Sequence, residues 1–296
     1  MDLTTFITQA MSGVTVAIFL FLTAVGLSLI FGVVRVLNFA HGSFYMIGAY
    51  TAYQMSKWLG SGDVGFWAGA LAAALFVTLI GVAVERLLLR HLYGKDELFQ
   101  LLLTYGLVLI LADAVKAIWG VEQVSVSRPP SLSGAVMVFG TPFPIYNLAI
   151  IGICLLVVFL LWALIQKTSV GRIVRAASLD REMVGALGVN VSWLFTSVFA
   201  VGSFLAGLGG ALVAPVTAIT LGMDTEMIIA AFIAVVIGGL GSFWGTLLGA
   251  IIYGQVLSFG ILLMPRFSLF AVFALMAVIL VVRPYGLLGK RTASRA

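Results

Sequence analysis

Long runs of apolar residues, separated by short polar stretches, make up most of this chain. The first run extends from residue 3 to residue 34 without a charged side chain. A helix that crosses the hydrocarbon core of a bilayer needs about 20 apolar residues, because each residue advances it by about 1.5 Å. The sequence therefore predicts eight or nine membrane-crossing helices, at residues 9–31, 39–56, 66–84, 98–119, 147–166, 194–213, 227–243, 245–263 and 269–282.

Three of these segments are short for a complete crossing: residues 39–56, 227–243 and 269–282. A bilayer tolerates irregular backbone only where protein or a water-filled path satisfies its polar groups. We therefore expect some of these helices to be tilted, broken or re-entrant.

The composition supports a membrane protein. Hydrophobic residues make up 62% of the chain and charged residues 9%, whereas soluble domains average about 45–50% and about 25%. Too few charged side chains are present to cover a water-exposed surface, so most of the surface must face the lipid bilayer. The predicted fold class is an all-α polytopic membrane protein, with residues 1–296 forming a single transmembrane domain.

The basic residues predict the orientation of the bundle. If nine segments alternate in direction, twelve of the sixteen Lys and Arg residues fall on one side and four on the other. Cytoplasmic loops are enriched in these residues, so the N-terminus is expected outside and the C-terminus in the cytoplasm. The same rule explains the net charge of +5 without a nucleic-acid partner. The twelve are Arg35, Arg86, Arg90, Lys95, Lys167, Arg172, Arg175, Arg181, Arg283, Lys290, Arg291 and Arg295, and the four are Lys57, Lys116, Arg128 and Arg266.

Several kinds of chemistry are not expected from this sequence. One Cys and two His residues cannot build a Cys/His metal cluster, so we expect no metal and no cofactor. The phosphate-binding loop of ATPases needs Ser or Thr after Gly-Lys, but Asp96 follows Lys95 and Arg291 follows Lys290. Any energy from ATP must therefore come from a partner. Because the sequence places no paired carboxylates, nucleophile-base pair or metal cluster at membrane depth, we expect no enzymatic activity in this chain. Acidic residues in the candidate spans, Glu85 and Asp113, lie near the ends, where charged side chains usually reach the interface.

The polar stretch between the first two predicted helices is a candidate substrate path. Asn38, His41 and Ser43 supply polar groups, and Gly42 allows the backbone to turn or unwind. Phe39 and Phe44 add an apolar wall for an aliphatic side chain. An equally supported alternative is that Asn38 and Ser43 cap helix ends and that His41 is a satisfied buried imidazole.

Two loops are candidate contact surfaces. The predicted external loop, residues 121–146, contains four prolines and is expected to form an ordered cap of turns. The predicted cytoplasmic loop, residues 168–192, is expected to hold a short amphipathic helix, capped by Ser178 or Asp180 and ended by Gly188. This helix fits a groove on another protein, or else it lies on its own bundle. Its expected apolar face consists of Leu179, Met183 and Leu187.

Glycines are concentrated near the last two predicted helices. Gly238, Gly239 and Gly241 lie within four residues, and each weakens a helix by about 1 kcal/mol relative to Ala. We expect a break or hinge there. Gly245 and Gly249 continue the four-residue spacing and are expected to pack against another helix.

Three motifs together resemble the LivH-type permeases of bacterial branched-chain amino acid ABC importers. Residues 26–42 with 48–50 are similar to the N-terminal signature of that family. Residues 175–177 with 186–190 are similar to its cytoplasmic coupling loop, and residues 238–242, with the two glycines that follow, to its late glycine motif. One departure lies in residues 180–182, which do not reproduce the Glu-Ala-Ala motif of other ABC permeases.

The resemblance implies import of Leu, Ile, Val or related amino acids across a bacterial inner membrane. It also implies a second homologous permease chain, two cytoplasmic ATPase subunits and a periplasmic binding protein. Together with the amphipathic helix predicted in the cytoplasmic loop, it leads us to expect ATPase coupling at Leu179, Asp180, Arg181, Glu182, Met183, Leu187 and Gly188.

Two alternatives remain at this point. A permease of the same fold can transport urea, short amides or sugars, because helix geometry does not identify the cargo. A self-contained facilitator or channel is also compatible with the missing ATP site.

Overall fold

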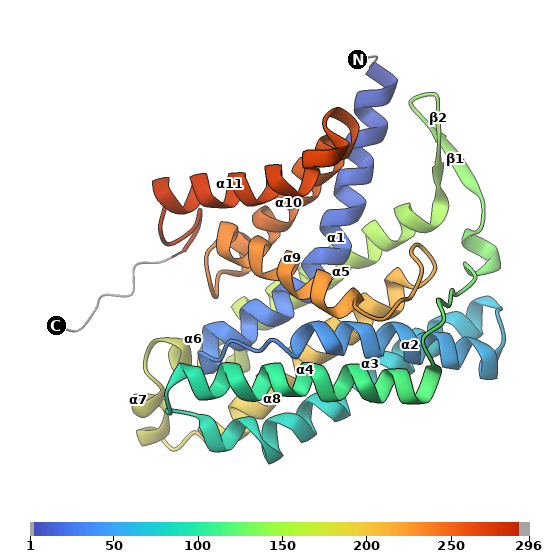
Figure 1. Ribbon diagram of the computed structural model, residues 1–296. Helices are drawn as coiled ribbons and strands as arrows, with labels where there is room; N and C mark the ends of the chain where they lie inside the picture. The colour runs from blue at the N-terminus through green and yellow to red at the C-terminus, as the bar shows by residue number, and fades with distance from the viewer. Residues whose placement is uncertain (1–2, 290–296) are drawn as a thin grey trace.

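The computed structural model describes residues 3–289 and consists almost entirely of α-helices (Figure 1). Lys290, Arg291 and Arg295 lie outside the described residues. The polytopic all-α prediction is confirmed. The long helices are α1 (Leu3–Val34), α2 (His41–Leu59), α3 (Asp63–Leu87), α4 (Glu97–Trp119), α5 (Ile145–Lys167), α8 (Val191–Val213), α9 (Met223–Gly238), α10 (Phe243–Leu263) and α11 (Ser268–Val282), and the shorter ones are α6 (Ser169–Leu179) and α7 (Arg181–Ala186).

Each predicted segment corresponds to one long helix. Seven of these are long and apolar enough to cross a bilayer, when α11 is counted together with the 3-10 turn before it as Pro265–Val282. The other two are α2, which is more polar, and α9, which has only 16 residues. At about 1.5 Å per residue, α9 is about 24 Å long and shorter than the hydrocarbon core. The predicted end of this helix at residue 243 is wrong: it ends at Gly238, because Gly239 and Gly241 adopt positive φ angles of 108° and 76°.

Helix α8 lies in the interior of the bundle and packs against α1, α2 and α3, while α1 also packs against α9 and α10. Close approach depends on paired glycines. Gly48 of α2 faces Gly207 of α8, and Gly26 of α1 faces Gly202 of α8. A side chain at Gly48, Gly26 or Gly202 would meet the facing helix, and one at Gly207 would meet Val77 of α3.

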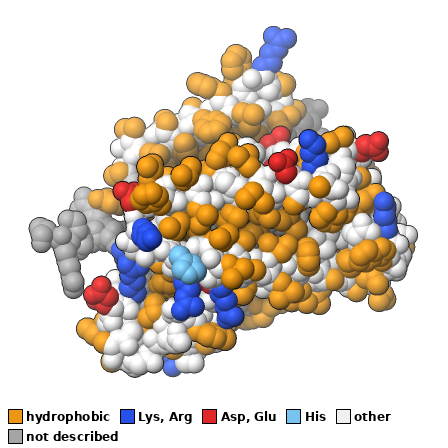
Figure 2. All heavy atoms as spheres, turned by 60° about the horizontal axis from the view of Figure 1, so that its bottom comes forward, with side chains coloured by type: hydrophobic (Ala, Val, Ile, Leu, Met, Phe, Trp, Pro, Cys, Tyr) orange, Lys and Arg blue, Asp and Glu red, His pale blue; other side chains and the backbone are white. Residues whose placement is uncertain are grey.

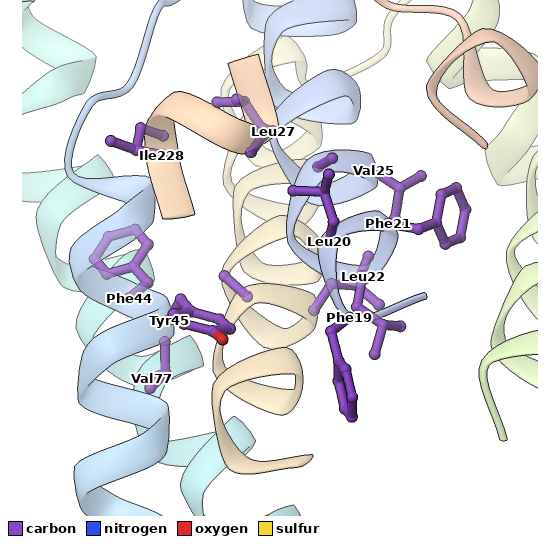
Figure 3. Close-up of a cluster of buried hydrophobic side chains, with 14 of the residues drawn as sticks. Phe19, Leu20, Phe21, Leu22, Val25, Leu27, Phe44, Tyr45, Val77 and Ile228 are labelled. Carbon is purple, nitrogen blue, oxygen red and sulfur yellow. The ribbon is translucent and has the colours of Figure 1, made fainter. Parts of the chain in front are cut away.

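Figure 3 shows buried apolar side chains of this core, among them Phe19, Leu22 and Val25 of α1 and Phe44 and Tyr45 of α2.

The helices differ in how much of their surface faces outward. Within the apolar window of α1, 78% of the residues are buried, against 22% for α4 and α5 and 11% for α11. Figure 2 shows the resulting surface, in which hydrophobic side chains predominate. The outer helices therefore supply the lipid-facing surface.

Segments that the charge pattern assigns to one side of the membrane lie together. On the predicted external side, the Ser131 hydroxyl donates to Asp63 at 2.7 Å, and Val124 pairs with Ile219. On the predicted cytoplasmic side, Arg35 donates to the Ser178 carbonyl at 3.4 Å. A group of Lys and Arg side chains surrounds an exposed histidine at one end of the bundle (Figure 2). The absolute orientation stays a prediction.

The predicted external loop contains a β-hairpin that the sequence did not predict. Strands β1 (Ala135–Val138) and β2 (Thr141–Pro144) pair in antiparallel fashion. Phe139 and Gly140 connect them with φ angles of 49° and 85°, and two positive φ angles are typical of the tight turns that join such strands. Phe-Gly is not a usual sequence for this turn, so the hairpin was missed. Figure 1 shows the hairpin at the end of the bundle opposite to α6 and α7.

Candidate substrate path and coupling surface

The backbone between α1 and α2 is broken as predicted, but not at the predicted residue. Helix α1 ends at Val34, Arg35 adopts a φ of 58°, and α2 begins only at His41. Gly42 lies inside the first turn of α2. A Cβ on Gly42 would overlap the Asp224 carbonyl oxygen and lie 2.9 Å from the Cβ of Ile228. The expectation that Gly42 unwinds the chain is therefore wrong: it lets α2 approach α9.

Asn38 and His41 are fully buried beside this break. The Asn38 Oδ1 accepts a hydrogen bond from the Ala40 amide at 3.1 Å, and its Nδ2 has no partner. This bond lies in the turn before α2, whose N-cap is Ala40 without a side-chain cap bond, so the expectation that Asn38 caps the helix is wrong. The His41 Nε2 donates to the Thr23 carbonyl oxygen at 3.0 Å, and its Nδ1 has no partner. Both side chains are thus only partly satisfied, and groups of this kind usually hydrogen-bond to buried water.

Asp224 is a buried acidic residue that the sequence analysis missed. Its side chain is 3% exposed and accepts a hydrogen bond from the Ser43 hydroxyl at 3.3 Å. Ser43 therefore contacts α9 and does not cap α2. Asp224 precedes the predicted segment 227–243, so the hydropathy pattern assigns it to a loop. Its signal is local, because an acidic residue two positions after Gly222 is typical of the first turn of a helix.

The two candidate aromatic residues point in different directions. Phe44 is fully buried and stacks edge-on against Phe199 of α8 at 6.2 Å. Phe39 contacts Phe232 of α9 at 5.3 Å and lines an apolar groove together with Tyr105 of α4. The six candidate path residues therefore meet at one junction of α1, α2 and α9, where five of them are buried and Phe39 is half-buried.

The predicted cytoplasmic loop forms two helices instead of one. Asp180 separates them, and its Oδ1 accepts hydrogen bonds from the amides of Glu182 and Met183, each at 3.0 Å. Leu179 ends α6, so the predicted single face that includes it is wrong. The physical reason is the extended backbone of Asp180, which serves as the cap of α7. Gly188 follows α7 with a φ of 85°.

Apolar side chains of this loop remain uncovered. Leu179 is 79% exposed, Met183 60% and Leu187 76%, whereas Val184 is buried beneath α7. The loop thus contacts its own bundle through Val184 and leaves the other three side chains available to another protein. Arg181 and Glu182 are exposed beside them.

Glu85 of α3 is hydrogen-bonded to α8, the helix that follows the α6–α7 loop. The expectation that it reaches the interface is wrong, because it is fully buried. Its carboxylate accepts hydrogen bonds from Thr196 of α8 at 2.7 Å and from Tyr93 at 3.0 Å. Burial, together with the nearby Glu85 charge, raises the pKa of the Tyr93 phenol, so it stays protonated and donates. Sequence position alone did not show that two donors would hold this carboxylate inside.

The late glycines form a tight helical hairpin. The Ser242 hydroxyl accepts from the Gly245 amide at 3.1 Å and so caps α10. Cβ atoms on Gly245 and Gly249 would collide with the carbonyls of Gly238 and Ala234 in α9. The chain after α11 closes on the same turn, where the Leu288 amide donates to the Gly238 carbonyl at 2.9 Å.

Among residues 3–289, no group of three or more His, Cys, Asp or Glu side chains is placed to hold a metal ion. The chemistry available at the junction is therefore that of hydrogen bonding and charge. Such groups can bind and pass a polar solute between apolar helices.

Comparison with known proteins agrees with this architecture. The family described as branched-chain amino acid transport system / permease component matches residues 9–282. The chain is 30% identical over 306 residues to the high-affinity branched-chain amino acid transport system permease protein BraD of Pseudomonas aeruginosa, and the alignment covers 96% of each chain. It is 28% identical to the corresponding permease protein LivH of Escherichia coli, again over 96% of each chain.

A shorter similarity, 34% over 136 residues, links 43% of the chain to 38% of the fructose import permease protein FrcC of Rhizobium meliloti. No solved structure shows a significant match. The family match spans most of the chain and includes the three motifs from which the resemblance was inferred. This multi-pass membrane protein therefore belongs to the family of permease components of branched-chain amino acid transport systems.

Proposed function

We propose that this chain is the permease subunit of an ABC importer that moves Leu, Ile, Val or related amino acids into the bacterial cytoplasm. The observation that carries the proposal is the family match over residues 9–282, together with relatives that are named for branched-chain amino acid transport along nearly their whole length. The expected location is the bacterial inner membrane, with the N-terminus outside.

The energy for transport is proposed to come from two cytoplasmic ATPase subunits that contact α7. The uncovered side chains of Leu179, Met183 and Leu187 support this contact, because a water-exposed apolar cluster is stabilised when another protein covers it. Asp180, Arg181, Glu182 and Gly188 belong to the same segment and shape or flank that surface.

Movement of α7 has a direct route into the bundle. A short turn joins α7 to α8, whose first turn is capped by Asn190 through the Trp193 amide at 3.0 Å. Helix α8 is hydrogen-bonded to α3 through Thr196 and Glu85, and it packs against α1 and α2 at paired glycines. A displacement of α7 would therefore reach the junction that contains Asn38 and His41, where ATP-driven closure can shift the population of path conformations.

The cargo is proposed to pass this junction in the assembled complex. Asn38, His41 and Ser43 offer polar groups for a zwitterion, and Phe39 and Phe44 offer apolar contacts. Because these side chains are closed off in the single chain, a second homologous permease chain is needed to complete the path. The Gly238–Gly241 turn joins α9 to α10 and is proposed to act as a hinge beside it.

The external hairpin is the proposed receiving surface for a periplasmic binding protein. Met137 is 67% exposed and Phe139 74% exposed at its tip. High affinity is expected to belong to that binding protein, because a permease that held its cargo tightly would release it slowly.

The similarity to a fructose import permease supports a second candidate cargo, a sugar. We propose a test in proteoliposomes that contain the complex purified from its native host with its co-purifying subunits. Uptake of labelled leucine should require ATP and should be inhibited by valine and isoleucine, but not by fructose or urea. Uptake of leucine without ATP would instead identify a facilitator, and competition by fructose would identify a sugar permease.

The orientation is tested by single cysteines in a Cys154→Ala background. An impermeant thiol reagent should label Ser131→Cys in intact cells, and should label Ser178→Cys only after the membrane is opened. The reverse pattern would invert the proposed topology and would place α7 on the wrong side for an ATPase.

A further inference from the structure

An apolar groove between α5, α6 and α8 includes none of the residues assigned to the path or to the coupling surface. Helix α5 contributes Leu161 and Leu164 to it, α6 contributes Val170 and Val174, and α8 contributes side chains between residues 194 and 201. One serine is the only polar side chain among the residues that line it. Water would find almost no hydrogen-bond partner there. In a membrane the groove is therefore filled by hydrocarbon, either a lipid acyl chain or side chains of another protein.

The depth of the groove matches one leaflet of the bilayer. On α8 it extends to Val201, about 15 Å along the helix from its first residue, Val191. On α5 it begins at Leu161 and runs toward the last residue, Lys167. The hydrocarbon core is about 30 Å thick, so one leaflet contributes about 15 Å. The groove thus spans one half of the core, at the end of the bundle that holds α6 and α7 (Figure 1).

The size of the groove suits an acyl chain better than a helix. Its volume is about 490 Å³, counting its open mouth. A helix segment about 15 Å long and about 10 Å in diameter would occupy about 1,200 Å³, so only a narrower occupant enters. The mouth opens toward the outside of the bundle, because Leu164 is 39% exposed and Val170 is 50% exposed. A lipid molecule can therefore reach the groove from the surrounding leaflet.

The helices that line the groove provide positive charge at the end where a lipid head group would lie. Helices α1, α5, α6 and α8 contain no Asp or Glu. Lys167 and Arg172 are exposed, and the Lys167 Nζ lies 5.5 Å from the ring centroid of Trp162, a pairing typical of the membrane interface. Arg175 donates to the carbonyl oxygen of Ile165, which lines the groove, and a guanidinium has further donors. This end of the groove therefore attracts an anion.

We infer that the groove binds one acyl chain of an anionic phospholipid, whose phosphate is held by Lys167, Arg172 and Arg175. Basic sites between transmembrane helices on the cytoplasmic side suit such head groups, because charge attraction adds to the packing of the chain. A zwitterionic lipid offers the same chain without a net charge, so the groove would prefer the anionic class. This inference goes beyond the proposed function and does not depend on the cargo.

A bound lipid would also support the coupling loop. Helix α6 packs directly on the end of α5, since a Cβ on Gly171 would overlap the carbonyl oxygens of Leu164 and Ile165. The valines of α6 that line the groove face α8 across it, and Asp180 joins α6 to α7. An acyl chain would fill the space between α6 and α8 and so fix the position of α7.

The test measures binding of phosphatidylglycerol to the purified, delipidated complex by native mass spectrometry. The wild type should bind it about tenfold more tightly than phosphatidylcholine with the same acyl chains. Leu164→Trp should fill the mouth of the groove and weaken binding about tenfold, and Val170→Trp should do the same from α6. Leu160→Trp is the matched control and should bind as the wild type does, because Leu160 lies one turn earlier on α5, is 55% exposed and does not line the groove.

The head-group contact is tested by Lys167→Gln and Arg172→Gln. Each should weaken phosphatidylglycerol binding about fivefold and leave phosphatidylcholine binding unchanged. The control is Lys57→Gln on the predicted external side. Lys57 is also an exposed lysine in the last turn of a helix, and its Nζ lies 4.3 Å from the ring centroid of Tyr53. This variant should bind both lipids as the wild type does.

Four results would overturn the inference. Equal binding of the two lipids would remove the preference for an anion, and equal losses in Leu164→Trp and Leu160→Trp would remove the groove. Displacement of phosphatidylglycerol by glycerol phosphate alone would indicate a site for free phosphate. If the wild type binds no lipid and Leu164→Trp releases the second permease chain, the groove is a contact between protein chains. None of these measurements involves transport, so each outcome leaves the proposed function untouched.

Discussion

The break between α1 and α2 and the α6–α7 loop both interrupt the helical bundle, but they place their side chains in opposite ways. At the break, the polar side chains of Asn38 and His41 are fully buried and only partly hydrogen-bonded. In the loop, the apolar side chains of Leu179 and Leu187 are more than three-quarters exposed. Each arrangement raises the free energy of the isolated chain, by desolvation in the first region and by hydration of apolar surface in the second.

The two regions are stabilised by different partners. Buried polar atoms without partners are stabilised by water or by a polar solute, so the break suits a path. Exposed apolar atoms at the water-facing end are stabilised by a covering protein, so the loop suits a coupling contact. If this comparison is right, substitutions in the first region should alter uptake or packing, and substitutions in the second should alter the association of the ATPase.

The largest effect is expected for Gly42→Val. The valine side chain would collide with the Asp224 backbone, which belongs to a packed helix and cannot move aside easily. We expect destabilisation of about 3 kcal/mol or more and little assembled complex. The measurement is the amount and the melting temperature of the purified complex. The control is Gly106→Val in α4, where no atom lies within 4 Å of the added Cβ; equal yields for the two variants would contradict the assigned packing role.

A smaller but more selective effect is expected for Met183→Asp. A carboxylate on the coupling surface would be desolvated against an apolar groove at a cost of about 2 kcal/mol or more, so ATPase association should weaken by at least about tenfold. Co-purification of the ATPase subunits measures this directly. The bundle should still fold, because Met183 is 60% exposed.

Met137→Asp on the external hairpin serves as its control, since that side chain is equally apolar and 67% exposed. It should leave ATPase association unchanged. An unchanged ATPase content in Met183→Asp would remove the coupling surface from α7.

The smallest effect is expected for Asn38→Leu, which removes the acceptor for the Ala40 amide. Loss of one such hydrogen bond costs about 1 kcal/mol, so assembly should survive. Uptake of leucine by reconstituted complex should fall several-fold, because the polar lining of the break is reduced, while the affinity of the isolated binding protein stays the same. Normal uptake would leave Asn38 with only its role in the turn before α2.

Much of the local structure was predictable, because its causes lie within a few residues. In lipid a backbone can satisfy its polar groups only by forming a helix, so the apolar runs determine where helices form. Short-range signals also determined several ends: Asp180 caps α7, Gly188 follows it with positive φ, and the glycines after Gly238 break the chain.

The tertiary structure alone decided which faces meet. In a soluble helix the apolar face marks the interior, but in a membrane helix both the lipid-facing and the buried faces are apolar. Helices α1 and α11 are both apolar and uncharged, yet 78% of one window is buried and only 11% of the other. For the same reason the sequence did not show that Glu85 and Asp224 are enclosed by donors from distant helices, or that Gly42 is a contact point. These contacts depend on which helices pack together, and the hydropathy of the sequence does not specify that.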